Sequence, residues 1–409
     1  MNVAALPLSF PDEVRLRDRL AARLLLRRLA RWRGAALTLV LPDRRELALG
    51  DPAAQPRITA WIDDWRFFWR ALTAGDIGVG ESYMDGEWRT NDLVGLCRCF
   101  LADSAVLDYG SAWTIGDRLR NLWRRLATLN TLSGSRRNIR YHYDLSNDFF
   151  RLFLDESMLY SCAIFSREDA TLAEAQLEKI DGICKRLELR PGHEVLEIGS
   201  GWGAFAIHAA REYGCRVTSL TLSEEQLRLA RERVAAAGLE DRVAIRLCDY
   251  RDASGSFDRI VSIEMFEAVG YEYFGAFFQE CAQRLRRGGR MLLQTISVPD
   301  QRFDRYRRSL DWIRKYVFPG GLLPSLHEIT RAVKQHTSLR VNRVEDIGAH
   351  YARTLHLWRE RFLARLPEVR RLGFDDRFIR MWEFYLASCE AAFAVRYVGD
   401  LQIELEQPA

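Results

Sequence analysis

Three glycines follow an acidic residue at alternate positions near the middle of the chain. The stretch is Glu-Ile-Gly-Ser-Gly-Trp-Gly, which runs from Glu197 through Gly199 and Gly201 to Gly203. Glycine permits positive φ and lets the backbone approach a ligand closely. An apolar strand is predicted just before the glycines and an apolar helix just after them, and open parallel sheets bind ligands at such strand ends. The pattern therefore predicts a cofactor-binding turn. Its third glycine comes one residue too early for the dinucleotide fingerprint G-x-G-x-x-G.

Two acidic residues follow another apolar strand, and they could handle a proton or orient an anion. Glu267 lies near the carboxyl end of the predicted strand 258–263, and Glu264 is a second acid close by whose role stays open. An acid at the start of a helix can also be purely structural, because the helix dipole favours negative charge there.

Strands and helices alternate through the second part of the chain, a rhythm that predicts a doubly wound, mostly parallel α/β sheet. The expected strands are 194–198, 216–220, 243–247, 258–263 and 290–296, and the expected helices are 170–187, 203–213, 223–237, 271–286 and 325–335. A smaller N-terminal α+β domain is expected over residues 1–115. An arginine-rich linker over 116–140 and a catalytic domain over 141–409 complete the predicted organisation.

The N-terminal part contains three features that bear on its fold. Residues 14–33 carry eight arginines and one acid, Asp18, between regularly spaced leucines. This pattern predicts a basic amphipathic helix that lies on a membrane or packs on a core. Residues 36–41 and 46–49 predict a hairpin. The glycines in 75–80 are expected to break whatever element precedes them.

Composition narrows the class of protein. The 409 residues are 48% hydrophobic and carry a net charge of +4, which is enough apolar material for a large core. We find no apolar run near twenty residues, and no signal peptide is expected. Eight scattered cysteines favour a cytoplasmic chain with reduced thiols. His142 is interpreted as structural, and no metal site is expected.

Eight motifs occur in an order that resembles the cyclopropane fatty acid synthase family, which includes the mycolic acid cyclopropane synthases. They lie at residues 80–86, 142–150, 160–163, 197–203, 220–226, 266–270, 318–321 and 350–355. The resemblance covers nearly the whole chain. It implies a Rossmann-like class I methyltransferase fold and S-adenosylmethionine as cofactor, and it assigns lipid binding to the small N-terminal domain.

The resemblance also implies a reaction. In that family a cis double bond of a phospholipid acyl chain attacks the sulfonium methyl. The resulting carbocation loses a proton from the added methyl and closes to a cyclopropane. A bound bicarbonate ion is thought to take the proton. Such chemistry needs an aligned donor, exclusion of water, aromatic faces around the cation and a weak base.

Site residues follow from the matched motifs. The bicarbonate site is expected at Cys162, Glu267, Gln294, Ile296 and Tyr351. The cofactor is expected to contact Tyr160, Ser161, Glu197, Gly199, Gly201, Thr221, Leu222, Gln226 and Tyr250. The chain departs from the family where histidine is usual, at Gln294 and at Ala268. An amide donates a hydrogen bond but carries no charge, so the departure at Gln294 puts the deprotonation step and the product in question.

The expected product is a cyclopropane fatty acyl phospholipid, and the alternative is a methyl-branched or methylene chain. The aromatic and basic stretch 302–318 suits an acyl chain with a phosphate head group, or equally a buried helix. The expected partners are unsaturated phospholipid at the inner face of a membrane and a second copy in a homodimer. Arginine patches also suit nucleic acid, but no base-flipping motif accompanies them. A non-catalytic lipid-binding protein is the third possibility.

Overall fold

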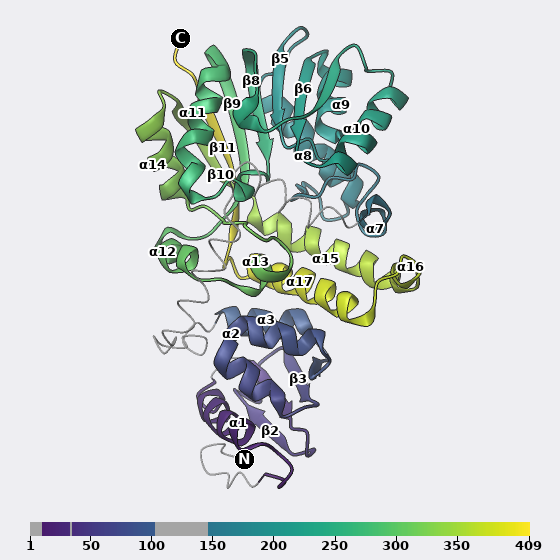
Figure 1. Cartoon of the computed structure of the whole chain (residues 1–409), viewed down its shortest axis with the longest axis vertical. Helices are drawn as coiled ribbons and strands as arrows, with labels where there is room; N and C mark the ends of the chain where they lie inside the picture. The colour runs from purple at the N-terminus through teal and green to yellow at the C-terminus, as the bar shows by residue number, and fades with distance from the viewer. Residues whose placement is uncertain (1–9, 33–34, 103–145) are drawn as a thin grey trace.

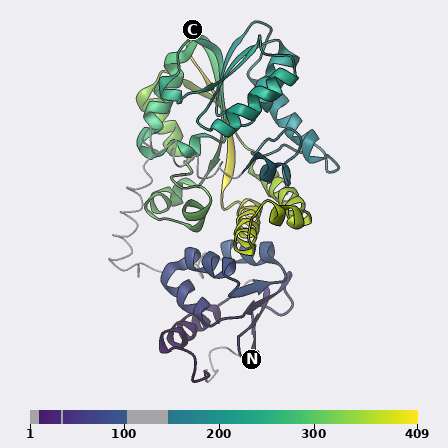
Figure 2. The ribbon, with the colours of Figure 1, turned by 45° about the vertical axis from the view of Figure 1, so that its right-hand side comes forward.

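The computed structural model describes residues 10–32, 35–102 and 146–409. The predicted linker 116–140, both predicted domain boundaries and His142 lie outside these residues. The described part is layered. A four-stranded sheet with its helices lies at the N-terminal end, a seven-stranded sheet flanked by helices lies at the other end, and long C-terminal helices lie between them (Figures 1 and 2).

The N-terminal domain contains a sheet of order β2-β1-β3-β4. Its strands are β1 (Ala36–Val40), β2 (Glu46–Leu49), β3 (Arg57–Ile62) and β4 (Trp88–Thr90), and its helices are α1 (Leu16–Leu29), α2 (Arg66–Met84) and α3 (Leu93–Ala102). β1 pairs antiparallel with β2, which confirms the predicted hairpin. The predicted helix 14–33 corresponds to α1, which packs on α2.

The glycines of 75–80 break the helix that precedes them, as predicted. Gly75 has a φ of +59° and a ψ of −132°, so α2 consists of two helical segments on either side of this residue. Gly80 lies against a neighbouring side chain instead, since a Cβ there would come 2.4 Å from the indole of Trp312. These glycines therefore provide a break between two helical segments and a close contact with Trp312.

The second sheet confirms the doubly wound fold, with the order β10-β11-β9-β8-β5-β6-β7. Its strands are β5 (Glu194–Ile198), β6 (Arg216–Thr221), β7 (Val243–Leu247), β8 (Phe257–Ile263), β9 (Leu285–Ser297), β10 (Arg340–Asp346) and β11 (Gly399–Glu406). The five predicted strands pair in parallel, and β11 pairs antiparallel with β9 and β10. The sequence did not predict β10 or β11.

Helices cover both faces of this sheet (Figure 1). Successive residues of one strand, such as Val195 and Leu196, point into two different clusters of buried apolar side chains. α8 (Leu172–Arg186), α9 (Ala204–Tyr213) and α10 (Glu224–Ala236) pack in one cluster, while α11 (Phe274–Arg284) and α14 (Leu326–His336) pack in the other. The remaining helices are α7 (Asn147–Arg151), α12 (Asp300–Arg308), α13 (Trp312–Tyr316), α15 (Gly348–Ala364), α16 (Leu366–Arg371) and α17 (Asp376–Ala394).

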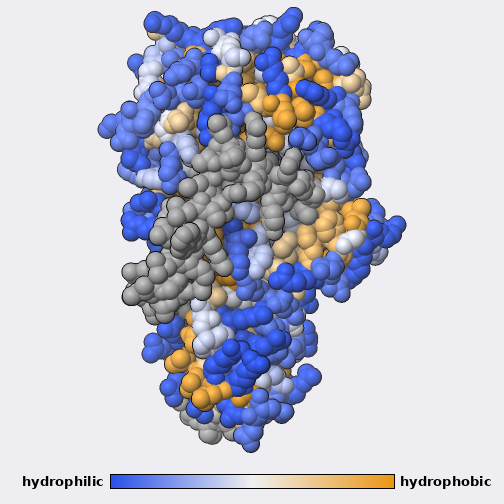
Figure 3. Space-filling view, in the orientation of Figure 1, coloured by the Kyte–Doolittle hydropathy of each residue, from blue (hydrophilic) through white to orange (hydrophobic). Residues whose placement is uncertain are grey.

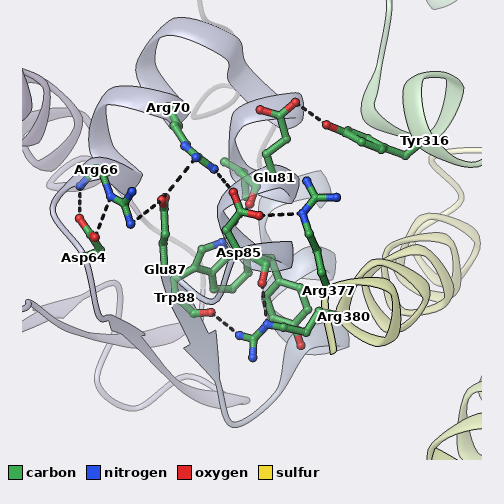
Figure 4. A network of polar contacts seen from close by, with 12 residues as sticks. Asp64, Arg66, Arg70, Glu81, Asp85, Glu87, Trp88, Tyr316, Arg377 and Arg380 are labelled. Atoms are coloured by element: carbon green, nitrogen blue, oxygen red, sulfur yellow. Dashed lines mark hydrogen bonds and ion pairs between the residues drawn. The ribbon is translucent and has the colours of Figure 1, made fainter. Parts of the chain in front are cut away.

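α17 joins the two ends of the molecule. Arg377 Nε donates to Asp85 Oδ1 over 2.9 Å, and Arg380 donates to the backbone oxygens of Tyr83 and Trp88 over 2.7 and 3.1 Å (Figure 4). One continuous cluster of buried apolar residues also extends from the N-terminal sheet through α15 and α17. The N-terminal domain is thus packed directly on the helical layer.

The aromatic stretch 302–318 forms α12, α13 and the turn that follows. Trp312 is buried against Phe384 of α17, with ring centroids 4.8 Å apart, and its backbone N–H donates to Asp76 over 3.0 Å. Tyr316 donates to Glu81 over 2.7 Å. Trp312 is the buried residue of α13, and it packs this helix on α17. No helix within the described ranges is both long and apolar enough to cross a bilayer.

Candidate active site

The glycine turn lies between β5 and α9. Gly199, Gly201 and Gly203 have φ of +98°, +49° and +84°, values that favour glycine. The turn is anchored to β6, because the backbone N–H groups of Gly199 and Ser200 both donate to the oxygen of Leu220. A Cβ on Gly201 would meet no atom within 4 Å, so the backbone here borders open space.

Glu197 lies at the end of β5, below this turn. It is buried, and Ser219 Oγ donates to its Oε2 over 2.5 Å. Burial raises the pKa of this carboxyl to about 8. At the end of the next strand, Thr221 Oγ1 donates to Gln226 Oε1 over 2.9 Å. These two predicted cofactor residues are therefore held together.

A small hollow lies beside the turn and is lined by Leu222, Asp249, Tyr250, Arg251, Met265, Ala268 and Val269. The Tyr250 hydroxyl is buried and has no hydrogen-bond partner in the described part of the chain. A ligand that entered this hollow could supply the missing partner. The glycine turn, the hollow and the unpaired hydroxyl together fit an adenosine-containing cofactor such as S-adenosylmethionine.

Glu264 directly follows β8 and accepts three hydrogen bonds. Its Oε1 accepts from the backbone N–H of Cys162 over 2.7 Å and from Gln294 Nε2 over 2.8 Å. Its Oε2 accepts from the Tyr351 hydroxyl over 2.6 Å. The structure thus brings three predicted site residues together, but around a carboxylate that the sequence left without a role.

Glu267 pairs with the fourth predicted residue. The backbone N–H of Ile296 donates to Glu267 Oε1 over 2.5 Å, while Glu267 Oε2 is buried without a partner in the described ranges. Burial, and secondarily the charge of Glu264, raise the pKa of Glu267 to about 8. The Glu267 backbone oxygen accepts from Leu322 and so fixes the turn 318–321 beside the site.

Two further ionisable groups complete the cluster, and neither was predicted from the sequence. Asp400 of β11 accepts from Gln294 Nε2 over 2.9 Å, and burial followed by the charge of Glu264 raises its pKa well above the usual range. Lys179 of α8 is buried and donates to Ser161 Oγ over 2.5 Å. Burial lowers the Lys179 pKa, although Glu264 opposes that change.

Of these two residues, only Lys179 left an indication in the sequence. Lys179 falls on the apolar face of the predicted helix 170–187, where an unpaired lysine would be costly. Asp400 lies in a strand that was not predicted, so its position opposite Ile296 could not be inferred. Pairing of β9 with β11 is what brings Asp400 to the site.

Aromatic rings form one wall of the site. Tyr351 stacks on Phe393 with centroids 4.4 Å apart, and the hydroxyls of Tyr160 and Tyr385 lie 2.7 Å from each other. Tyr160 also lies 5.1 Å from the ring of Trp358. Electron-rich faces of this kind stabilise positive charge and exclude water.

Cys162 contributes its backbone to the cluster. Its thiol is fully buried and donates to the backbone oxygens of Ala163 and Ile347, and burial raises the thiol pKa well above its ordinary value. A nucleophilic thiolate is therefore disfavoured here.

The residues present do not fit a bicarbonate ion. The Cys162 N–H, Gln294 amide and Tyr351 hydroxyl already donate to Glu264, and the Ile296 N–H donates to Glu267. An external anion would have to displace these carboxylates and lie beside Asp400 as well. Across residues 10–32, 35–102 and 146–409, no group of three His, Cys, Asp or Glu side chains could hold a metal ion.

Comparison with known proteins gives consistent matches. The family model described as mycolic acid cyclopropane synthetase matches residues 131–403. Tuberculostearic acid methyltransferase UfaA1 of Mycobacterium tuberculosis is 46% identical over 339 residues, which cover 80% of this chain and 78% of that protein. Cyclopropane-fatty-acyl-phospholipid synthase of Escherichia coli strain K12 is 39% identical over 339 residues, which cover 82% and 84%.

A solved structure with a similar fold is mycolic acid cyclopropane synthase CmaA1 complexed with SAH and CTAB. Its TM-score is 0.63 at 35% identity, and the match covers 66% of this chain and 98% of that one.

Proposed function

Because this chain belongs to the mycolic acid cyclopropane synthetase family, we propose that it uses S-adenosylmethionine to alkylate cis double bonds in phospholipid acyl chains. One observation carries the proposal. The glycine turn after β5 and the Glu264 carboxylate after β8 lie at adjacent strand ends, beside a wall of aromatic rings. A methyl donor, an olefin and a base could meet at that point.

The proposed roles of the residues follow from their positions. Gly199, Gly201 and Glu197 would hold the amino acid part of the cofactor, and Tyr160 and Ser161 would close over it. Thr221, Leu222 and Gln226 would contact the ribose, and Tyr250 the adenine. When bound, S-adenosylmethionine supplies an electrophilic methyl group. The rings of Tyr160, Tyr351 and Tyr385 would exclude water and stabilise positive charge on the acyl chain.

We propose a cyclopropane fatty acyl phospholipid as the product. The 39% identity to an E. coli cyclopropane-fatty-acyl-phospholipid synthase supports this choice. A second candidate is a methylated chain that does not close to a ring. Its support is the 46% identity to a tuberculostearic acid methyltransferase, together with Gln294 at the position where histidine is usual.

Product analysis tests both candidates. Purified protein is incubated with S-adenosylmethionine labelled with ¹³C in its methyl group and with vesicles of monounsaturated phosphatidylglycerol. We expect the label in the acyl chains, with ring protons far upfield in the proton NMR spectrum. Vinylic methylene signals in place of ring signals would select the second candidate. Label on RNA but not on lipid would refute both.

We also propose that α1 docks on an anionic bilayer. Leu16, Leu20 and Leu24 lie one helical turn apart and are 72%, 49% and 50% exposed. The guanidinium of Arg17 lies 5.6 Å from the ring of Trp69, which is also exposed. Figure 3 shows apolar surface over this part of the molecule. A leucine stripe flanked by arginines suits insertion at a negatively charged interface.

A matched pair of variants tests this docking. Leu20→Glu places a charge in the stripe, whereas Leu177→Glu alters an equally exposed leucine on α8. Flotation with phosphatidylglycerol vesicles should fall for Leu20→Glu and remain at the wild-type level for Leu177→Glu. Equal losses for the two variants would rule out α1 as the docking element.

A further inference from the structure

The hydrogen bonds around Glu264 have the pattern expected of an anion site. Its two carboxylate oxygens accept from the Cys162 backbone, the Gln294 amide and the Tyr351 hydroxyl, over distances of 2.6 to 2.8 Å. These are three of the five groups that the family resemblance assigns to an external bicarbonate. Carboxylate and bicarbonate share a planar O–C–O unit that carries the negative charge. The side chain of Glu264 therefore stands where that ion was expected.

The backbone at Glu264 is itself unusual. Its φ is +48°, in the left-handed region, which is unfavourable for a residue with a Cβ. The Glu264 N–H donates to the backbone oxygen of Gln294 over 2.8 Å and so holds this conformation. Strained backbone at a fixed position is a common property of functional sites. Here the left-handed turn accompanies a carboxylate that points back into the cluster.

The amide of Gln294 is also oriented for this contact. Gln402 Nε2 donates to Gln294 Oε1 over 2.9 Å, so the Gln294 amino group faces the two carboxyl groups. A glutamine held in this way donates to Glu264 and Asp400 at once. The departure from histidine at residue 294 thus coincides with a carboxylate supplied by the chain.

We propose that Glu264 is the catalytic base of this enzyme and takes the place of a bicarbonate ion. This inference rests on the proposed alkylation of an acyl double bond. The electron pair of the olefin π bond forms a new carbon–carbon bond to the methyl carbon as the sulfur–methyl bond of S-adenosylmethionine breaks, which leaves S-adenosylhomocysteine and a carbocation on the acyl chain. One C–H bond of the added carbon then breaks. Its electron pair forms the second bond of the ring, or the C=C bond of a methylene product. The proton moves to Glu264 and then to water when the product leaves.

The charges that face Glu264 suit this role. Asp400 and Glu267 have raised pKa values because of burial, which favours their protonated forms, and Lys179 lies close enough to lower the Glu264 pKa. Burial is nevertheless the largest influence on Glu264 and raises its pKa above the ordinary value. A carboxylate with a raised pKa is a better proton acceptor near neutral pH.

Anion binding gives the first test, and it does not depend on catalysis. ¹³C-labelled bicarbonate is titrated into the S-adenosylhomocysteine complexes of wild type, Glu264→Ala and Glu264→Gln, and bound bicarbonate is followed by ¹³C NMR line broadening. We expect saturable binding to Glu264→Ala alone, since alanine vacates the donors and glutamine fills the space. Glu264→Gly repeats the test without the left-handed strain. Saturable binding to wild type, or no binding to either small variant, would overturn the inference.

Activity gives the second test. In CO₂-free buffer the wild type should transfer methyl groups at its full rate, while Glu264→Ala should lose about 10²-fold or more, as expected for a missing general base. Formate or bicarbonate should restore at least part of that loss for Glu264→Ala and none for Glu264→Gln. Glu240→Gln, on the exposed surface, is the control. A wild type that needs added bicarbonate would refute the role of Glu264.

The two tests separate the possible failures. Label that never reaches acyl chains, with anion binding as expected, would refute the proposed function but leave Glu264 in the place of the ion. Acyl labelling with a Glu264→Ala variant that is fully active in CO₂-free buffer would refute the base and leave the proposed function intact.

Discussion

Replacing Gly80 with alanine should weaken the contact between the N-terminal domain and the rest of the protein. A Cβ on Gly80 would lie 2.4 Å from Cδ1 and Nε1 of Trp312, so the indole must retreat by about 1 Å to restore normal contact. The ring has little room, because it is 2% exposed and packs edge-on against Phe384. Such overpacking typically costs about 1–3 kcal/mol.

Helix propensity opposes this cost, so a matched variant is needed. Gly182 lies in α8, and a Cβ there would meet nothing within 4 Å. Both substitutions gain about 0.5–1 kcal/mol because alanine replaces glycine within a helix. The difference in unfolding free energy between Gly80→Ala and Gly182→Ala should therefore equal the overpacking cost of about 1–3 kcal/mol.

Urea unfolding followed by circular dichroism measures that difference through the midpoint and slope of each variant. We expect Gly182→Ala to unfold at higher urea than wild type and Gly80→Ala at lower urea. If both variants gained stability equally, Trp312 would have room to move, and the tight contact of α2 with α13 would be refuted.

Three further predictions concern single residues. Arg380→Met should lower the free energy of unfolding by about 1.5–3 kcal/mol, because Arg380 donates to two backbone oxygens. Arg377→Met should lower it by less than about 1 kcal/mol, because the ion pair of Arg377 with Asp85 is exposed. Thermal unfolding of the two variants measures the difference. The pKa of Glu197 is about 8 in the folded protein and about 4.5 in the unfolded chain, so the unfolded chain loses this proton at lower pH. The free energy of unfolding should therefore fall as pH rises from about 4.5 to 8. In Glu197→Gln, the urea midpoint should depend less on pH over this range. Tyr250→Phe should leave the stability of the cofactor-free protein unchanged, because the hydroxyl has no hydrogen-bond partner in the described chain. The same substitution should weaken S-adenosylmethionine binding severalfold, as measured by calorimetry.

The parts of the fold that follow hydrophobic pattern could be predicted from the sequence. The five parallel strands are apolar runs bounded by turns, and each was located within a few residues except for the start of β9. There the predicted strand begins at 290, but β9 begins at Leu285 with an irregular register before Arg290. β10 and β11 were missed because charged residues interrupt them, and β10 is almost wholly exposed.

The site could be predicted only in part, for a related reason. Motifs identify residues that lie close together in the sequence, and they placed Cys162, Gln294 and Tyr351 in one region. They could not show that Glu264 accepts hydrogen bonds from all three, because that depends on a left-handed φ and on three separate elements. The position of Asp400 in the site could not be predicted, because it depends on the pairing of β11 with β9.

α17 contacts both the small N-terminal domain and the candidate active site. Near its first turn, Arg377 and Arg380 donate hydrogen bonds to the small domain. Farther along the helix, the Tyr385 hydroxyl is hydrogen-bonded to the hydroxyl of Tyr160. Six residues beyond its last turn the chain reaches Asp400. The proposed docking of the small domain on lipid would therefore act on the residues of the site through this one helix.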